Sequence, residues 1–148
     1  MRNKKHLSAA LMAALCAITF GAQSAFAVRT DVAGVIPKNM NNGTISANAA
    51  DVTLTAVDTV NNNSVTLDAG MSCLVQNSGG SPYTITFTSV ADHLGRTGDI
   101  TYTVAAGGFA LFGPVTLKGW MQTDGKVYYT GSNVAVKTLW IRPTNPNI

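Results

Sequence analysis

Apolar and polar side chains alternate strictly over residues 83–88, Tyr-Thr-Ile-Thr-Phe-Thr, so that three apolar side chains share one face and three threonines share the other. A period of two is typical of an antiparallel strand with one buried face. The same period recurs at Met71, Cys73 and Val75, which would share a face of the preceding strand. These patterns predict a fold built from short, half-buried strands.

Segments of this kind continue along the chain and are separated by turn residues. We expect strands at residues 51–57, 65–68, 71–76, 83–88, 100–104, 109–112, 115–121, 126–130 and 134–141. Asp124-Gly125 is typical of a two-residue type I′ turn and would join the strands at 115–121 and 126–130 in a hairpin. About nine short strands with such turns predict an all-β fold, a single antiparallel β-sandwich or barrel.

The first 27 residues follow a different pattern. A basic start precedes an apolar run over residues 7–20, and Ala25-Phe26-Ala27 then supplies the small-x-small pattern that signal peptidase cleaves. The run of about 14 residues is shorter than the roughly 20 that span a bilayer. We therefore expect a cleavable signal peptide at residues 1–27, export to the periplasm, cell surface or medium, and no membrane insertion after cleavage.

Residues 28–50 show neither a helical nor a strand period and are rich in Asn, Gly, Ala and Thr. This composition predicts a flexible N-terminal arm that precedes a β-sandwich domain at residues 51–148. The arm contains one apolar stretch that is a candidate assembly strand, formed by Val32, Ala33, Gly34, Val35 and Ile36.

Removal of the predicted signal peptide changes the net charge of the chain. The whole chain has ten Lys and Arg against seven Asp and Glu, a formal net charge of +3. Three of the ten cationic residues belong to the signal, so the remainder carries seven charges of each sign. A neutral surface offers no electrostatic footprint for nucleic acid or anionic membrane, and it favours association with other protein copies.

The chain contains few side chains that could act in catalysis. Beyond residue 27 there is one histidine, His93, one cysteine, Cys73, and no glutamate. We therefore expect no enzyme, no catalytic residues and no cofactor. We expect Cys73 to be a buried thiol that behaves as a small apolar side chain, with a reactive thiol or an intermolecular bridge as the alternatives.

The loop at residues 92–99 is the one candidate for metal binding. Asp92, His93 and Asp99 could offer ligands to calcium, but their spacing differs from that of an EF-hand loop and Arg96 lies among them. An ordinary loop with an ion pair between Arg96 and an aspartate is favoured, so we expect no metal. Arg96 is also a candidate contact residue.

Most aromatic side chains are scattered over the predicted strands, as expected of a sandwich core. Trp120, close to the predicted hairpin, and Tyr129, out of phase with Tyr128, are the aromatics we expect to be exposed and available for contacts. A carbohydrate-binding or adhesin module that uses Trp120, Tyr129 or Trp140 is therefore one alternative function.

A series of turn motifs carries a family resemblance. In order, these are Gln76-Asn77-Ser78-Gly79-Gly80-Ser81, Leu94-Gly95-Arg96-Thr97-Gly98-Asp99-Ile100, Ala105-Ala106-Gly107, Phe112-Gly113-Pro114, Trp120-Met121-Gln122 and Asp124-Gly125-Lys126-Val127. Over about Asp51 to Arg142 the chain resembles the small β-rich head proteins of tailed bacteriophages that decorate or cement capsids. The resemblance implies a non-enzymatic structural protein that binds copies of itself or a repeating protein lattice through strand edges and loops. Such head proteins assemble in the cytoplasm, so the resemblance implies a virion location where the signal implies export.

A third function follows from the arm. If Val32–Ile36 were donated as a strand to the open sheet edge of the next copy, main-chain hydrogen bonds would build a cell-surface or extracellular filament.

Overall fold

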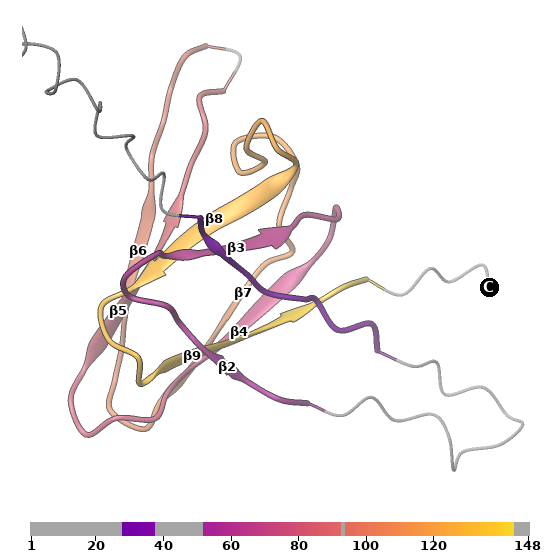
Figure 1. Cartoon of the computed structure of the whole chain (residues 1–148). Coiled ribbons are helices and arrows are strands. Elements are labelled where there is room, and N and C mark those ends of the chain that lie inside the picture. Colours follow the sequence, from indigo (N-terminus) through magenta and orange to yellow (C-terminus); the bar gives the residue numbers. More distant parts are fainter. Residues whose placement is uncertain (1–27, 38–51, 93, 144–148) are drawn as a thin grey trace, which may run out of the picture.

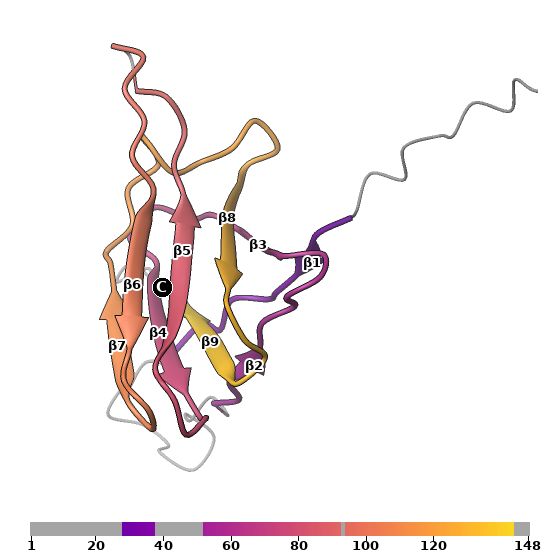
Figure 2. The same cartoon turned by 90° about the vertical axis from the view of Figure 1, so that its left-hand side faces the viewer.

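The computed structural model describes residues 28–37, 52–92 and 94–143. In this part of the chain nine strands form two sheets that pack as a sandwich, which confirms the all-β prediction (Figures 1 and 2). The described residues include no helix long and apolar enough to cross a membrane. The predicted signal peptide, residues 1–27, and residues 38–50 of the predicted arm lie outside the described residues.

The two sheets are built from strands that are distant in sequence. The strands are β1 (Thr30–Asp31), β2 (Thr55–Ala56), β3 (Asn63–Thr66), β4 (Ser72–Asn77), β5 (Tyr83–Thr88), β6 (Ile100–Val104), β7 (Phe109–Phe112), β8 (Lys126–Gly131) and β9 (Val136–Ile141). One sheet has the order β1-β3-β8-β5-β6, and the other has the order β2-β9-β4-β7. Neighbouring strands are antiparallel except for β1 and β3, which are parallel.

The core lies between the sheets and follows the predicted alternation. Cys73 and Val75 of β4 are fully buried, and Ile85 and Phe87 of β5 face them from the other sheet. Trp140 of β9 is the largest fully buried side chain among the described residues. Because inward positions recur every second residue, the period of two that marked these strands in the sequence is also the pattern of their burial.

The predicted strand at residues 115–121 does not form, so the predicted hairpin with 126–130 is wrong. The type I′ turn predicted at Asp124-Gly125 does not form either: the N–H of Gly125 donates to the carbonyl of Gln122 at 3.0 Å, so Thr123 and Asp124 are the central residues of the turn, and Gly125 follows them with a left-handed φ of +78°. Before that turn, however, Gly119 adopts a left-handed φ of +86°, which interrupts an extended backbone. β8 pairs instead with β3 and β5, strands far from it in sequence.

The segment Val32–Ile36 lies against its own domain. The N–H of Val32 donates to the carbonyl of Ser64 in β3 at 2.8 Å, and the N–H of Val35 donates to the carbonyl of Trp140 in β9 at 2.7 Å. The segment therefore bridges the two sheets along one side of the sandwich, and the side chain of Val32 is buried there.

The carboxylate of Asp58 accepts several hydrogen bonds on this side of the sandwich. Its carboxylate accepts hydrogen bonds from the Thr30 hydroxyl at 2.6 Å and from the N–H groups of Val60 and Asn61 at 2.8 and 2.9 Å. The hydrogen bond from Thr30, followed by those from Asn61 and Val60, holds the pKa of Asp58 well below its ordinary value.

We expect this carboxylate to make the stability of the domain depend on pH. A folded-state pKa below the unfolded value of about 3.9 stabilises the fold above that pH, and this stabilisation decreases as the pH falls from the unfolded pKa towards the lower folded pKa. Urea unfolding at pH 6 and pH 3 should show a smaller loss of stability on acidification for Asp58→Asn than for the wild type. Equal losses in the two proteins would contradict this role of Asp58.

Candidate functional site

The two sheet edges on the β1–β2 side of the sandwich are protected. β1 and β2 have only two residues each. The carboxylate of Asp31 in β1 pairs with the ammonium of Lys126 at 3.1 Å. Very short strands and charged side chains are the usual means by which proteins keep a sheet edge from pairing with another chain.

The opposite side of the sandwich has neither protection. β6 and β7 are edge strands of the two sheets, with five and four residues. Figure 2 shows both strands on the same side of the sandwich, each in its own sheet, and the turn Ala105–Gly108 connects them. Residues 100–117 contain no Asp, Glu, Lys, Arg or His. We call β6, β7 and the turn between them the β6–β7 edge.

Large apolar side chains are exposed along the β6–β7 edge. Ile100 and Tyr102 share the inward face of β6 with the buried Val104, yet 44% and 50% of their surface is exposed. On β7, Phe109 and Leu111 point away from the core and are 60% and 68% exposed. Inward-facing residues of an edge strand lack a neighbouring side chain on one side. The apolar side chains of β6 are therefore partly uncovered, and a further strand next to β6 would cover them.

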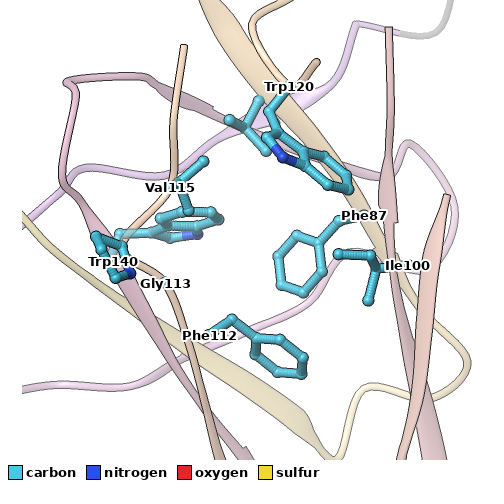
Figure 3. Close-up of a pocket in the computed structure, with 9 residues that line it drawn as sticks. Phe87, Ile100, Phe112, Gly113, Val115, Trp120 and Trp140 are labelled. Atoms are coloured by element: carbon cyan, nitrogen blue, oxygen red, sulfur yellow. The ribbon is translucent and has the colours of Figure 1, made fainter. Parts of the chain in front are cut away.

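An apolar cavity lies directly behind this edge (Figure 3). It has a volume of about 170 Å³ and is lined by Phe87, Ile100, Phe112, Gly113, Pro114, Val115, Trp120, Val127 and Trp140. The ring centroids of Phe87 and Phe112 are 4.9 Å apart, and those of Tyr102 and Phe112 are 5.6 Å apart. The contact between Tyr102 and Phe112 links β6 to β7 across the two sheets, so the exposed edge and the cavity form one continuous apolar region.

The aromatic residues considered as contact residues, Trp120, Tyr129 and Trp140, are partly or fully buried in the structure. Trp120 is half-buried and lines the cavity. The prediction that Tyr129 is exposed is wrong, because its side chain is fully buried and its hydroxyl lies 3.1 Å from that of Thr138. Tyr129 lies on a central strand in phase with the buried Val127, and burial raises its pKa to about 12. Trp140 is also fully buried, so these three aromatics form no exposed platform.

Arg96 is exposed and makes the predicted ion pair. Its guanidinium lies 2.7 Å from the carboxylate of Asp92. The backbone N–H and the side chain of Arg96 hold the pKa of Asp92 below its ordinary value. Asp99 accepts instead from the N–H of Ser89 at 2.8 Å. The two aspartates thus have separate partners in a loop that extends beyond the ends of β5 and β6 (Figure 2).

No group of three metal-ligating side chains occurs within residues 28–37, 52–92 and 94–143. His93, the middle member of the calcium hypothesis, lies outside these ranges. Cys73 is fully buried in the core, as predicted, and burial raises the pKa of its thiol well above the ordinary value.

The residues that define the β6–β7 edge were not predicted as contact residues. Both strands were predicted with their correct bounds, and the charge-free run at 100–117 is visible in the sequence. That run is the one sequence signal that could have identified the edge.

Comparison with protein-family models, with curated proteins and with solved structures finds no match.

Proposed function

We propose that this protein is a non-enzymatic structural subunit that associates with copies of itself or with a repeating protein lattice through the β6–β7 edge. The observation that carries the proposal is the contrast between the two sides of the sandwich. One side has edges of only two residues each, one of which contains the charged Asp31, whereas the other presents two longer, uncharged edges with exposed apolar side chains. Protein surfaces of this kind are typical of interaction sites.

A strand added to this edge would both pair with its open main-chain groups and cover its exposed apolar side chains. The outer N–H and C=O groups of β6 and β7 face no further strand in the described part of the chain, and an added strand would pair with them. The same strand would cover Ile100 and Tyr102, whose side chains flank the cavity. Main-chain hydrogen bonds and apolar burial would then act in the same contact.

The predicted resemblance to capsid decoration proteins supports a function of this type, because those proteins also act by binding a repeating lattice. Export and subsequent assembly at the cell surface or outside the cell stay predictions that depend on the signal at residues 1–27. Filament assembly by donation of Val32–Ile36 receives less support, because that segment is paired with its own β3 and β9 and would first have to leave them.

A charge placed on the β6–β7 edge should block association. Leu111 is suited to this test, because its side chain points outward and a lysine there would leave the core intact. We expect the wild type to form larger species as its concentration rises in sedimentation velocity. Leu111→Lys should need at least about tenfold higher concentration to reach the same degree of association, since a charged edge residue disfavours strand pairing.

Val60→Lys is the matched control. Val60 is 82% exposed in the turn before β3, on the other side of the sandwich, so this variant introduces the same charge at an equally accessible apolar position. It should associate as the wild type does. If Leu111→Lys and the wild type associate equally, the β6–β7 edge is not the interface, and a wild type that stays monomeric at every concentration without binding a lattice would overturn the proposal altogether.

A further inference from the structure

The cavity behind the β6–β7 edge has a buried floor and an exposed rim. Trp140 and Val127 form the floor, and at most 1% of their surface is exposed. The rim is formed by exposed residues, Ile100 of β6 and Gly113 and Pro114 directly after β7. The cavity therefore opens to the surface between β6 and the segment that follows β7, and a small molecule can reach it from solvent.

The wall of the cavity is apolar and largely aromatic. Figure 3 shows four aromatic rings around a common space, those of Phe87, Phe112, Trp120 and Trp140. No lining residue is charged, and among the lining side chains only the two tryptophans carry a polar atom, the indole nitrogen. An ordered water needs roughly two to four polar partners, whereas an apolar cavity of about 150 Å³ can take up benzene. With a volume of about 170 Å³, this cavity has room for a molecule with one aromatic ring.

Trp140 also contributes an unpartnered hydrogen-bond donor. Its indole N–H is buried and makes no hydrogen bond within the described part of the chain. Burial raises the pKa of Tyr129 and the side chains of Thr138 and Trp140 lower it, so the N–H lies near the Tyr129 hydroxyl without reaching hydrogen-bond geometry. That hydroxyl already lies 3.1 Å from the hydroxyl of Thr138. A buried donor without a partner costs free energy, and an acceptor atom on a ligand would remove this cost.

From the volume of the cavity, its lining and this unpartnered donor, we infer that the cavity is a binding site for a neutral molecule with a single aromatic ring and one hydrogen-bond acceptor. The ring would lie among the four aromatic side chains, where offset-stacked and edge-to-face contacts are favourable. The acceptor would bind Nε1 of Trp140. A charged ligand is disfavoured, because the wall has no charged group to compensate it. The inference goes beyond the proposed function and does not depend on it, because the cavity lies within one copy of the chain.

Nuclear magnetic resonance of the isotope-labelled protein tests this inference, with acetophenone as the probe. Trp120 and Trp140 are the two tryptophans of the chain and both line the cavity, so the two indole N–H signals report directly on it. We expect both signals to shift saturably, with a dissociation constant of about 1 mM or lower for a ligand of this size. Ethylbenzene has nearly the same size but no acceptor, and it should bind at least about threefold more weakly.

Three phenylalanine variants locate the binding site. Val115→Phe and Ile100→Phe add a ring at the cavity wall, and each should weaken the binding of acetophenone at least about tenfold. Leu111→Phe is the matched control, because it adds the same ring on β7 at an exposed side chain that points away from the core, and it should bind as the wild type does. Circular dichroism verifies that each variant is folded. Ile100 is 44% exposed at the rim, so Ile100→Phe should fold even if Val115→Phe does not.

Two results would overturn the inference. If neither indole signal shifts up to the solubility limit of acetophenone, or if the folded Val115→Phe and Ile100→Phe variants bind it as tightly as the wild type, the cavity is not a binding site. If ethylbenzene binds as tightly as acetophenone, the N–H of Trp140 takes no part in binding and the inferred class of ligand is wrong. Neither result affects the sedimentation test of the proposed function, so the two can fail separately.

Discussion

Replacing Trp140 with alanine is expected to lower the free energy of unfolding by about 3–5 kcal/mol. The indole is fully buried, and its centroid lies 5.9 Å from that of Phe87 and 5.6 Å from that of Tyr129. Its removal would enlarge the cavity behind the β6–β7 edge, because Trp140 is part of the cavity wall. Since small domains are stable by only about 5–15 kcal/mol, the variant should be close to unfolding.

Urea unfolding followed by far-ultraviolet circular dichroism measures this loss. Trp120→Ala is the matched comparison, because Trp120 lines the same cavity but is only half-buried. It should lose clearly less stability than Trp140→Ala. A loss below about 1 kcal/mol for Trp140→Ala would mean that the sandwich core does not depend on this ring.

Replacing Asn77 with alanine is expected to lower the free energy of unfolding by about 2–4 kcal/mol, because three hydrogen bonds of a buried side chain, one fully buried and two part-buried, are lost together. The Asn77 side chain is fully buried at the end of β4. Its amide nitrogen donates to the carbonyls of Ser81 at 2.7 Å and Val104 at 3.0 Å, and its amide oxygen accepts from the N–H of Gly79 at 2.9 Å. The side chain thus holds the loop before β5 against the end of β6.

Asn133→Ala is the control for this experiment. The Asn133 side chain makes one local hydrogen bond, to the N–H of Ala135 at 2.9 Å, in a half-buried loop. Its loss should cost about 1 kcal/mol or less in thermal or urea unfolding. If the two variants are equally stable, the buried hydrogen bonds of Asn77 are not a significant part of the stability of the domain.

Asn77 also illustrates what local sequence signals omit. The run from Asn77 to Pro82 is rich in turn residues, and it was predicted as a loop for that reason. Nothing in the run indicates that this asparagine reaches the carbonyl of Val104, which lies 27 positions further along the chain. Tyr129 is a similar case, because its inward orientation depends on the pairing of β8 with β3 and β5.

The sequence by itself determined the strands whose signal is local. Residues 83–88, 100–104 and 109–112 form β5, β6 and β7 with the predicted bounds, because apolar side chains or turn residues close to them define where each strand begins and ends. It also determined the buried position of Cys73, which follows from the alternation around it.

Only the tertiary structure decided which strands became edges, and therefore where the candidate interface lies. An edge is defined by the absence of a neighbouring strand, and each strand's neighbours come from distant parts of the chain. The charge-free run at residues 100–117 is uniform in the sequence, yet folding placed its two strands at the edges of different sheets on one side of the sandwich. Local periodicity specifies which face of a strand is buried, whereas long-range pairing specifies which strand has an open side.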